Sequence, residues 1–131
     1  MAGKSMFPLL GHGSLAKVAL APFEDMRLGD IAVFKAGSGF MCHRVVGKKN
    51  LDKELFLKTK GDAVSCSDPL VRKDAFVGKV ITVRKGRFDI KIDNLTCRVI
   101  GLALSCLLPF ALRMFFWFKN MTMRYEIRHK A

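Results

Sequence analysis

Short apolar runs separated by turn-forming residues dominate the first two thirds of the chain. Four runs are rich in β-branched and aromatic residues, which suit the pleated, half-buried surface of a β-sheet. They are residues 31–34, 41–46, 55–57 and 76–83. Glycine-containing segments at 29–30, 36–39, 47–50 and 61–62 lie between the runs and predict turns. We therefore expect residues 1–93 to form a small, mainly β domain with antiparallel strands.

One long apolar segment follows at residues 99–118, and Arg113 is its only charged residue. As a helix the segment would extend about 30 Å, which matches the hydrocarbon core of a bilayer. That length fits a helix that spans a membrane, one that lies at its surface, or a buried core helix. Because the segment lacks the polar face of a soluble helix, we expect residues 94–131 to form a membrane-associated helix with a basic tail. Such a helix would pack little against the β domain.

The net positive charge of the chain indicates an anionic partner. The chain has 131 residues, of which half are hydrophobic, and 23 basic against 11 acidic residues give a net charge of +12. An excess of this size indicates a membrane surface, nucleic acid, or simply a solvated basic surface. The basic residues are scattered, without an arginine-rich arm, a zinc finger or an aromatic RNA-binding motif. We therefore expect a membrane partner rather than nucleic acid.

The four cysteines, at positions 42, 66, 97 and 106, form no C-x-x-C pair. The sequence therefore predicts no metal site, and nothing in it calls for a cofactor. An even number permits two disulfides, but the spacing requires none, so free thiols are the simpler expectation.

Two residues stand out as a possible nucleophile and base. Ser5 lies between a glycine and Pro8, where a turn can expose its hydroxyl, although a plain turn serine fits equally well. His43 lies in a run whose alternation places Met41, His43 and Val45 on one strand face, with Cys42 and Arg44 on the other. A neutral imidazole there could act as a general base, or simply be a core histidine with its hydrogen bonds satisfied.

Two carboxylates, Asp62 and Asp68, follow within one short segment. Either could accept a hydrogen bond from His43 and orient its ring. Their alternative roles are a turn residue for Asp62 and a turn or helix cap for Asp68.

Taken in order, these segments resemble the signal peptidase I family. Residues 3–10, GKSMFPLL, are similar to the family's G-x-S-M-x-P-x-L serine box. Residues 29–34 resemble its G-D-I-V-V-F strand, and residues 43–47, HRVVG, its base-bearing box. Residues 60–63 match K-G-D-N/A, and residues 76–80 are similar to V-x-G-K-V. The resemblance covers residues 3 to about 84.

The resemblance implies a serine endopeptidase that cleaves signal-peptide-like or leader segments. Most bacterial members have a lysine where this chain has His43, which is similar to the archaeal and endoplasmic-reticulum type. That type implies Ser5 as nucleophile, His43 as base, Asp68 as the relay carboxylate and Asp62 as support. Backbone N–H groups around Gly3 and Ser5 would hold the oxyanion. The substrate would be an extended peptide or protein segment with small residues before the cut.

Two alternatives to the signal-peptidase interpretation stay open. A self-cleaving repressor-type peptidase shares the fold, but uses a Ser–Lys dyad, which His43 does not match. A non-catalytic, basic, membrane-associated β module would also account for the charge.

Family members usually carry an anchor before the serine box, whereas four residues precede Ser5 here. Either a longer N-terminus or the C-terminal apolar segment would provide that anchor.

The catalytic interpretation makes a geometric prediction. Ser5 Oγ and a ring nitrogen of His43 should lie within hydrogen-bond reach, about 3 Å. The other ring nitrogen should face Asp68 or Asp62.

Overall fold

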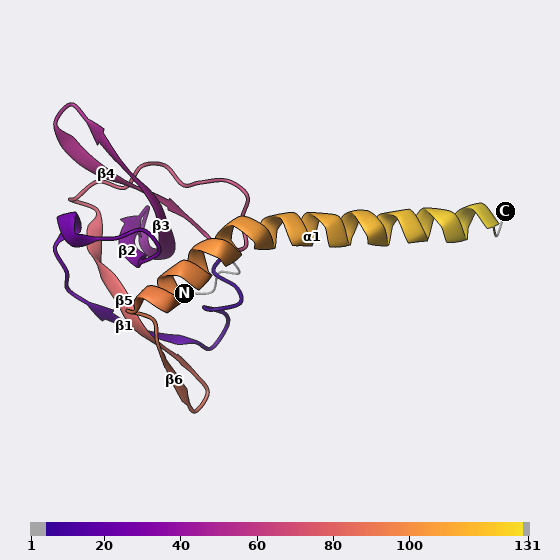
Figure 1. Ribbon diagram of the computed structural model, residues 1–131, viewed down its shortest axis with the longest axis horizontal. Coiled ribbons are helices and arrows are strands. Elements are labelled where there is room, and N and C mark those ends of the chain that lie inside the picture. The colour runs from indigo at the N-terminus through magenta and orange to yellow at the C-terminus, as the bar shows by residue number, and fades with distance from the viewer. Residues whose placement is uncertain (1–4, 130–131) are drawn as a thin grey trace.

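The computed structural model describes residues 5–129, with side chains described as far as residue 120. Within that range the chain forms a six-stranded antiparallel sheet followed by one long helix (Figure 1). The elements are β1 (Leu15–Ala19), the short 3-10 helix η1 (Phe23–Asp25), β2 (Ile31–Ala36), β3 (Gly39–Leu51), β4 (Glu54–Lys60), β5 (Phe76–Lys85), β6 (Phe88–Lys91) and α1 (Leu95–His129). The predicted mainly β fold with a C-terminal hydrophobic helix is confirmed.

The strands follow the order β1-β5-β2-β3-β4, and β6 pairs with the C-terminal part of β5. Every pairing is antiparallel, and β2–β3, β3–β4 and β5–β6 are hairpins. The long strand β3 therefore pairs with β2 along its first half, residues 39–44, and with β4 along its second half, residues 44–51. This position fixes the backbone of His43, whose register partner on β2 is Ala32.

One predicted turn is wrong, because residues 47–50 continue β3 rather than ending it. A register shift between Val45 and Gly47 lets the strand bend there and go on pairing with β4. The actual turn lies at Asp52 and Lys53, which both have positive φ values, of 49° and 67°. This part of the hairpin extends beyond the core, so its polar residues carry no burial pattern that would reveal a strand. Strands β1 and β6 were not predicted either, and their residues are largely exposed.

The core consists of two apolar clusters, one on each face of the sheet. Alternation along β2 sends Ala32 and Phe34 into one cluster and Ile31 and Val33 into the other. Both faces are covered, which explains why β2 is apolar at four consecutive positions. The second cluster includes Met6, so the residue after Ser5 is anchored in the core.

Helix α1 begins at Leu95, four positions before the predicted apolar segment. Asn94 caps it, accepting a hydrogen bond from the Cys97 N–H at 2.7 Å. Its first turns lie against the β domain and the rest projects away from it (Figure 1). Residues 95–120 are long and apolar enough to cross a membrane, and 17% of the most apolar window is buried. The expected single helix with exposed Leu and Phe side chains is present, although its first turns do pack on the domain.

Candidate active site

Ser5 and His43 come from segments that are far apart in sequence and fixed independently. His43 is on β3 and only 3% exposed, with its ring edge-on to Phe34. Ser5 begins a turn in which the Leu10 N–H donates to the Met6 carbonyl at 2.9 Å. The Ser5 carbonyl accepts a hydrogen bond from the Ala63 N–H at 2.8 Å. The serine turn is therefore tied to the loop that follows β4.

That loop approaches Ser5 closely because its first residue is Gly61. A Cβ at Gly61 would lie 2.7 Å from the Ser5 carbonyl oxygen and 2.9 Å from the Ser5 Cβ. Any larger residue would push Ser5 away from the loop. The glycine of the K-G-D segment thus has a steric reason for being there.

The predicted proximity of Ser5 and His43 is confirmed. Ser5 Oγ lies 3.0 Å from His43 Nε2, and Asp68 Oδ2 lies 2.5 Å from His43 Nδ1. With the Nδ1 proton directed at the carboxylate, Nε2 is left to accept the proton of the serine hydroxyl. Hydroxyl, imidazole and carboxylate therefore form one hydrogen-bonded series.

Asp68 is held in place by Thr59, a residue that the sequence interpretation did not identify. Thr59 Oγ1 donates to Asp68 Oδ2 at 2.8 Å, and the Asp68 N–H donates to the Thr59 carbonyl at 2.9 Å. Thr59 is fully buried. The available signal was a threonine on the inward face of an alternating strand, because a buried hydroxyl needs a partner.

The Asp62 carboxylate pairs with Arg44 rather than with His43. The Arg44 guanidinium donates to both Asp62 oxygens, at 2.8 and 2.7 Å, and its Nη1 donates to the Gly29 carbonyl at 2.8 Å. Both side chains are almost fully buried, so each charge depends on the other for compensation. Of the two candidate carboxylates, Asp68 is the one that orients the imidazole, and Asp62 supports the loop.

Of the two residues expected to provide oxyanion donors, Gly3 lies outside the described residues. Ser5 is the first residue described. Its own backbone N–H is adjacent to the nucleophilic oxygen by covalent geometry, as an oxyanion donor must be.

Cys42 is next to His43 in sequence, but it is a poor candidate for a nucleophile. Its side chain packs against the cluster that contains Ile31 and Val33, on the sheet face opposite to His43. Burial raises the pKa of the Cys42 thiol, so the reactive thiolate is disfavoured. None of the four cysteines is in a disulfide.

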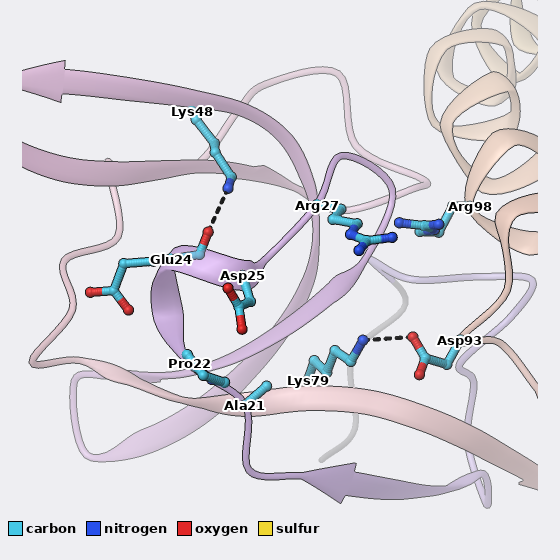
Figure 2. Close-up of a pocket in the computed structure, with 9 residues that line it drawn as sticks. All are labelled: Ala21, Pro22, Glu24, Asp25, Arg27, Lys48, Lys79, Asp93 and Arg98. Carbon is cyan, nitrogen blue, oxygen red and sulfur yellow. Dashed lines mark hydrogen bonds and ion pairs between the residues drawn. The ribbon is translucent and has the colours of Figure 1, made fainter.

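A separate cleft lies between η1, β3, β5 and the start of α1 (Figure 2). Both of its lysines have partners: Lys79 pairs with Asp93 at 2.6 Å, and Lys48 donates to the Glu24 backbone carbonyl at 2.9 Å. A hydrogen bond from Lys73 lowers the pKa of Glu24, which keeps that carboxylate ionised. Ser5, His43 and Asp68 do not line this cleft, and no acid–base pair in it resembles the one at Ser5.

Comparisons with protein-family models, curated proteins and solved structures find no match to this chain.

Proposed function

We propose that the protein is a serine endopeptidase of the signal peptidase type, acting at a membrane. The observation that carries this proposal is the hydrogen-bonded series Ser5–His43–Asp68. The order of its sequence boxes adds support, because hydroxyl, imidazole and carboxylate occur in the segments that the resemblance assigns to them.

The geometry supports acyl transfer through the serine. His43 Nε2 accepts the hydroxyl proton as Ser5 Oγ attacks the carbonyl carbon of a peptide bond. The imidazolium then protonates the leaving amine, which departs and leaves an ester on Ser5. A water molecule, deprotonated by the same imidazole, hydrolyses this ester and regenerates the hydroxyl. Asp68 holds the ring in the required tautomer and stabilises the imidazolium.

The tetrahedral oxyanion needs hydrogen-bond donors beside Ser5 Oγ. We assign the Ser5 backbone N–H to this role, together with a neighbouring donor in the serine turn. A single such donor contributes roughly 3–4 kcal/mol to transition-state stabilisation. Residues that pack against the serine turn, such as Gly61, therefore affect the reaction rate as well as the stability of the fold.

The proposed substrate is an extended leader segment with small residues before the cut, as the family resemblance implies. Membrane association is supported by helix α1 and by the net charge of +12, which attracts the chain to anionic lipid. An enzyme held at a membrane would meet substrates that are themselves membrane-inserted at one end.

A fluorophosphonate probe tests the proposal, because it reacts covalently with activated serines. The full-length protein in detergent should be labelled once, at Ser5, and Ser5→Ala should abolish labelling. Ser38→Ala is the matched control, because Ser38 lies in the exposed β2–β3 turn. Absence of labelling in folded wild-type protein would instead favour a non-catalytic, basic, membrane-associated β module.

A further inference from the structure

The docked segment of α1, residues 95–109, contacts the two strands that carry the candidate site. Arg44 on β3 and Lys60 on β4 are direct register partners. Arg44 follows His43 in sequence, and Lys60 precedes Gly61, which touches Ser5. Both cationic side chains reach α1, so the helix contacts the strands right beside the site.

Arg44 lies against Gly101 of the helix. A Cβ at Gly101 would overlap the Arg44 guanidinium, so only glycine leaves room for that group. The same guanidinium bonds both oxygens of Asp62. Gly101 therefore determines where the Arg44–Asp62 pair can lie.

Lys60 uses a carbonyl that the helix leaves without its usual donor. Its ammonium group donates to the Ser105 carbonyl oxygen. In a regular helix that oxygen would accept the N–H of residue 109, but residue 109 is proline and has no N–H. Pro109 and Ser105 are both buried, and the contact between Lys60 and the Ser105 carbonyl is partly buried.

A third contact lies one turn earlier, at Arg98. Gly29 has a φ of +90°, and a Cβ there would be 2.7 Å from the Arg98 Cβ. Figure 2 shows Arg98 directed from α1 toward the loop that carries Arg27. The Gly29 carbonyl in turn accepts a hydrogen bond from Arg44. Helix α1, the loop that contains Gly29, and the Arg44 side chain are therefore packed against one another.

We infer that the docked segment is a positioning element for the active site. Gly101 leaves room for the Arg44 guanidinium, the Ser105 carbonyl binds Lys60, and Arg44 binds Asp62. Ala63, the next residue, donates its N–H to the Ser5 carbonyl and fixes the serine turn against His43. This inference rests on the proposed peptidase function, and it makes the apolar helix part of the catalytic apparatus as well as an anchor.

The test compares the rate of fluorophosphonate labelling of Ser5 in full-length variants in detergent. Gly101→Leu should slow labelling roughly 10- to 100-fold, because displacements near 1 Å lower rates to that extent. Ala103→Leu is the matched control, since Ala103 lies on the exposed side of the same helical turn and should label at the wild-type rate.

Pro109→Ala separates positioning from general stability. Alanine restores the missing N–H, which would compete with Lys60 for the Ser105 carbonyl, and it favours the helix by itself. We expect slower labelling with an unchanged or higher melting temperature, a combination that a purely structural role would not produce. This variant also decides the question if Gly101→Leu does not fold.

The outcomes distinguish the two proposals. If wild-type protein is not labelled at Ser5, the peptidase proposal itself fails. If wild-type protein is labelled, and folded Gly101→Leu and Pro109→Ala react as fast as Ala103→Leu, the positioning inference alone is wrong.

Discussion

Ser5, His43 and Asp68 are connected in series, so each depends on the others for its chemical role. Without His43 the serine hydroxyl has no base at 3.0 Å, and without Ser5 the imidazole has no nucleophile to activate. Groups that act as a unit give non-additive effects when they are removed together.

We therefore expect Ser5→Ala and His43→Ala each to lower kcat/KM by a factor on the order of 10⁴ or more. The double variant should lose little beyond either single variant. Cleavage of a peptide with small residues before the cut provides the measurement, and circular dichroism checks the fold. Full activity in a folded Ser5→Ala protein would mean that another residue performs the chemistry.

Thr59 gives a second prediction, because its hydroxyl bonds the carboxylate that orients His43. A hydrogen bond to a charged group contributes about 1.5–3 kcal/mol, so Thr59→Val should lower kcat roughly 10-fold or more. KM should change little, since Thr59 is fully buried and acts through Asp68. Asp68→Asn should be affected more strongly. Thr82→Val on β5 is the control, and equal losses in Thr59→Val and Thr82→Val would refute this role.

The sequence was sufficient to identify Ser5, His43 and the two candidate carboxylates, because each lies in a short box of characteristic residues. Reasoning from the residues alone left the choice between Asp62 and Asp68 open, since that choice depends on how the loop after β4 folds back, whereas the family resemblance implied Asp68. Asp68 returns to Thr59, nine residues earlier, and this closure is visible only in three dimensions. The contact between Lys60 and Ser105 spans 45 residues and was equally beyond prediction.

At the scale of elements, strands with a buried face were predictable and exposed ones were not. Strand β2 has four buried apolar residues in a row, and its position was predicted correctly. Strand β6 is exposed at every position, so burial imposes no pattern on its sequence. The second half of β3 is similar, because Lys48, Lys49 and Asn50 lie on an exposed ribbon.

In the β5–β6 hairpin an exposed ion pair between the register partners Arg84 and Asp89 links the two strands. The guanidinium donates to both carboxylate oxygens, at 2.6 and 2.8 Å, and this hydrogen bonding lowers the pKa of Asp89. A depressed carboxyl pKa means that the pair is intact above the ordinary Asp value. The interaction is lost as the pH falls through the lowered pKa.

We predict that the Asp89 carboxyl titrates at lower pH in the wild type than in Arg84→Gln, as measured by carbon-detected NMR. Both side chains are exposed, so the difference should shrink as salt is added. An Asp89 midpoint unchanged by the substitution would show that the pair does not form in solution.

For the whole molecule, α1 has two parts with different surroundings. The docked segment, residues 95–109, has one side against the β domain and presents Val99, Ile100 and Leu104 on its other side. From Phe110 to Phe118 the helix is clear of the domain, and its side chains are exposed all around, including Phe115 and Trp117. A helix that is apolar on every side is stable in hydrocarbon rather than in water.

These two parts can be separated by truncation, and this gives the last prediction. Removing residues 110–131 deletes the exposed apolar part but keeps Gly101, the Ser105 carbonyl and the docked segment. Full-length protein should remain with membranes after carbonate extraction, whereas the 1–109 chain should be released and still be labelled at Ser5. A 1–93 chain should also be released, but with slow labelling, because it lacks the contacts to Arg44 and Lys60. Recovery of full-length protein in the soluble fraction, with all three chains behaving alike, would mean that α1 is no anchor and that the proposed membrane association is wrong.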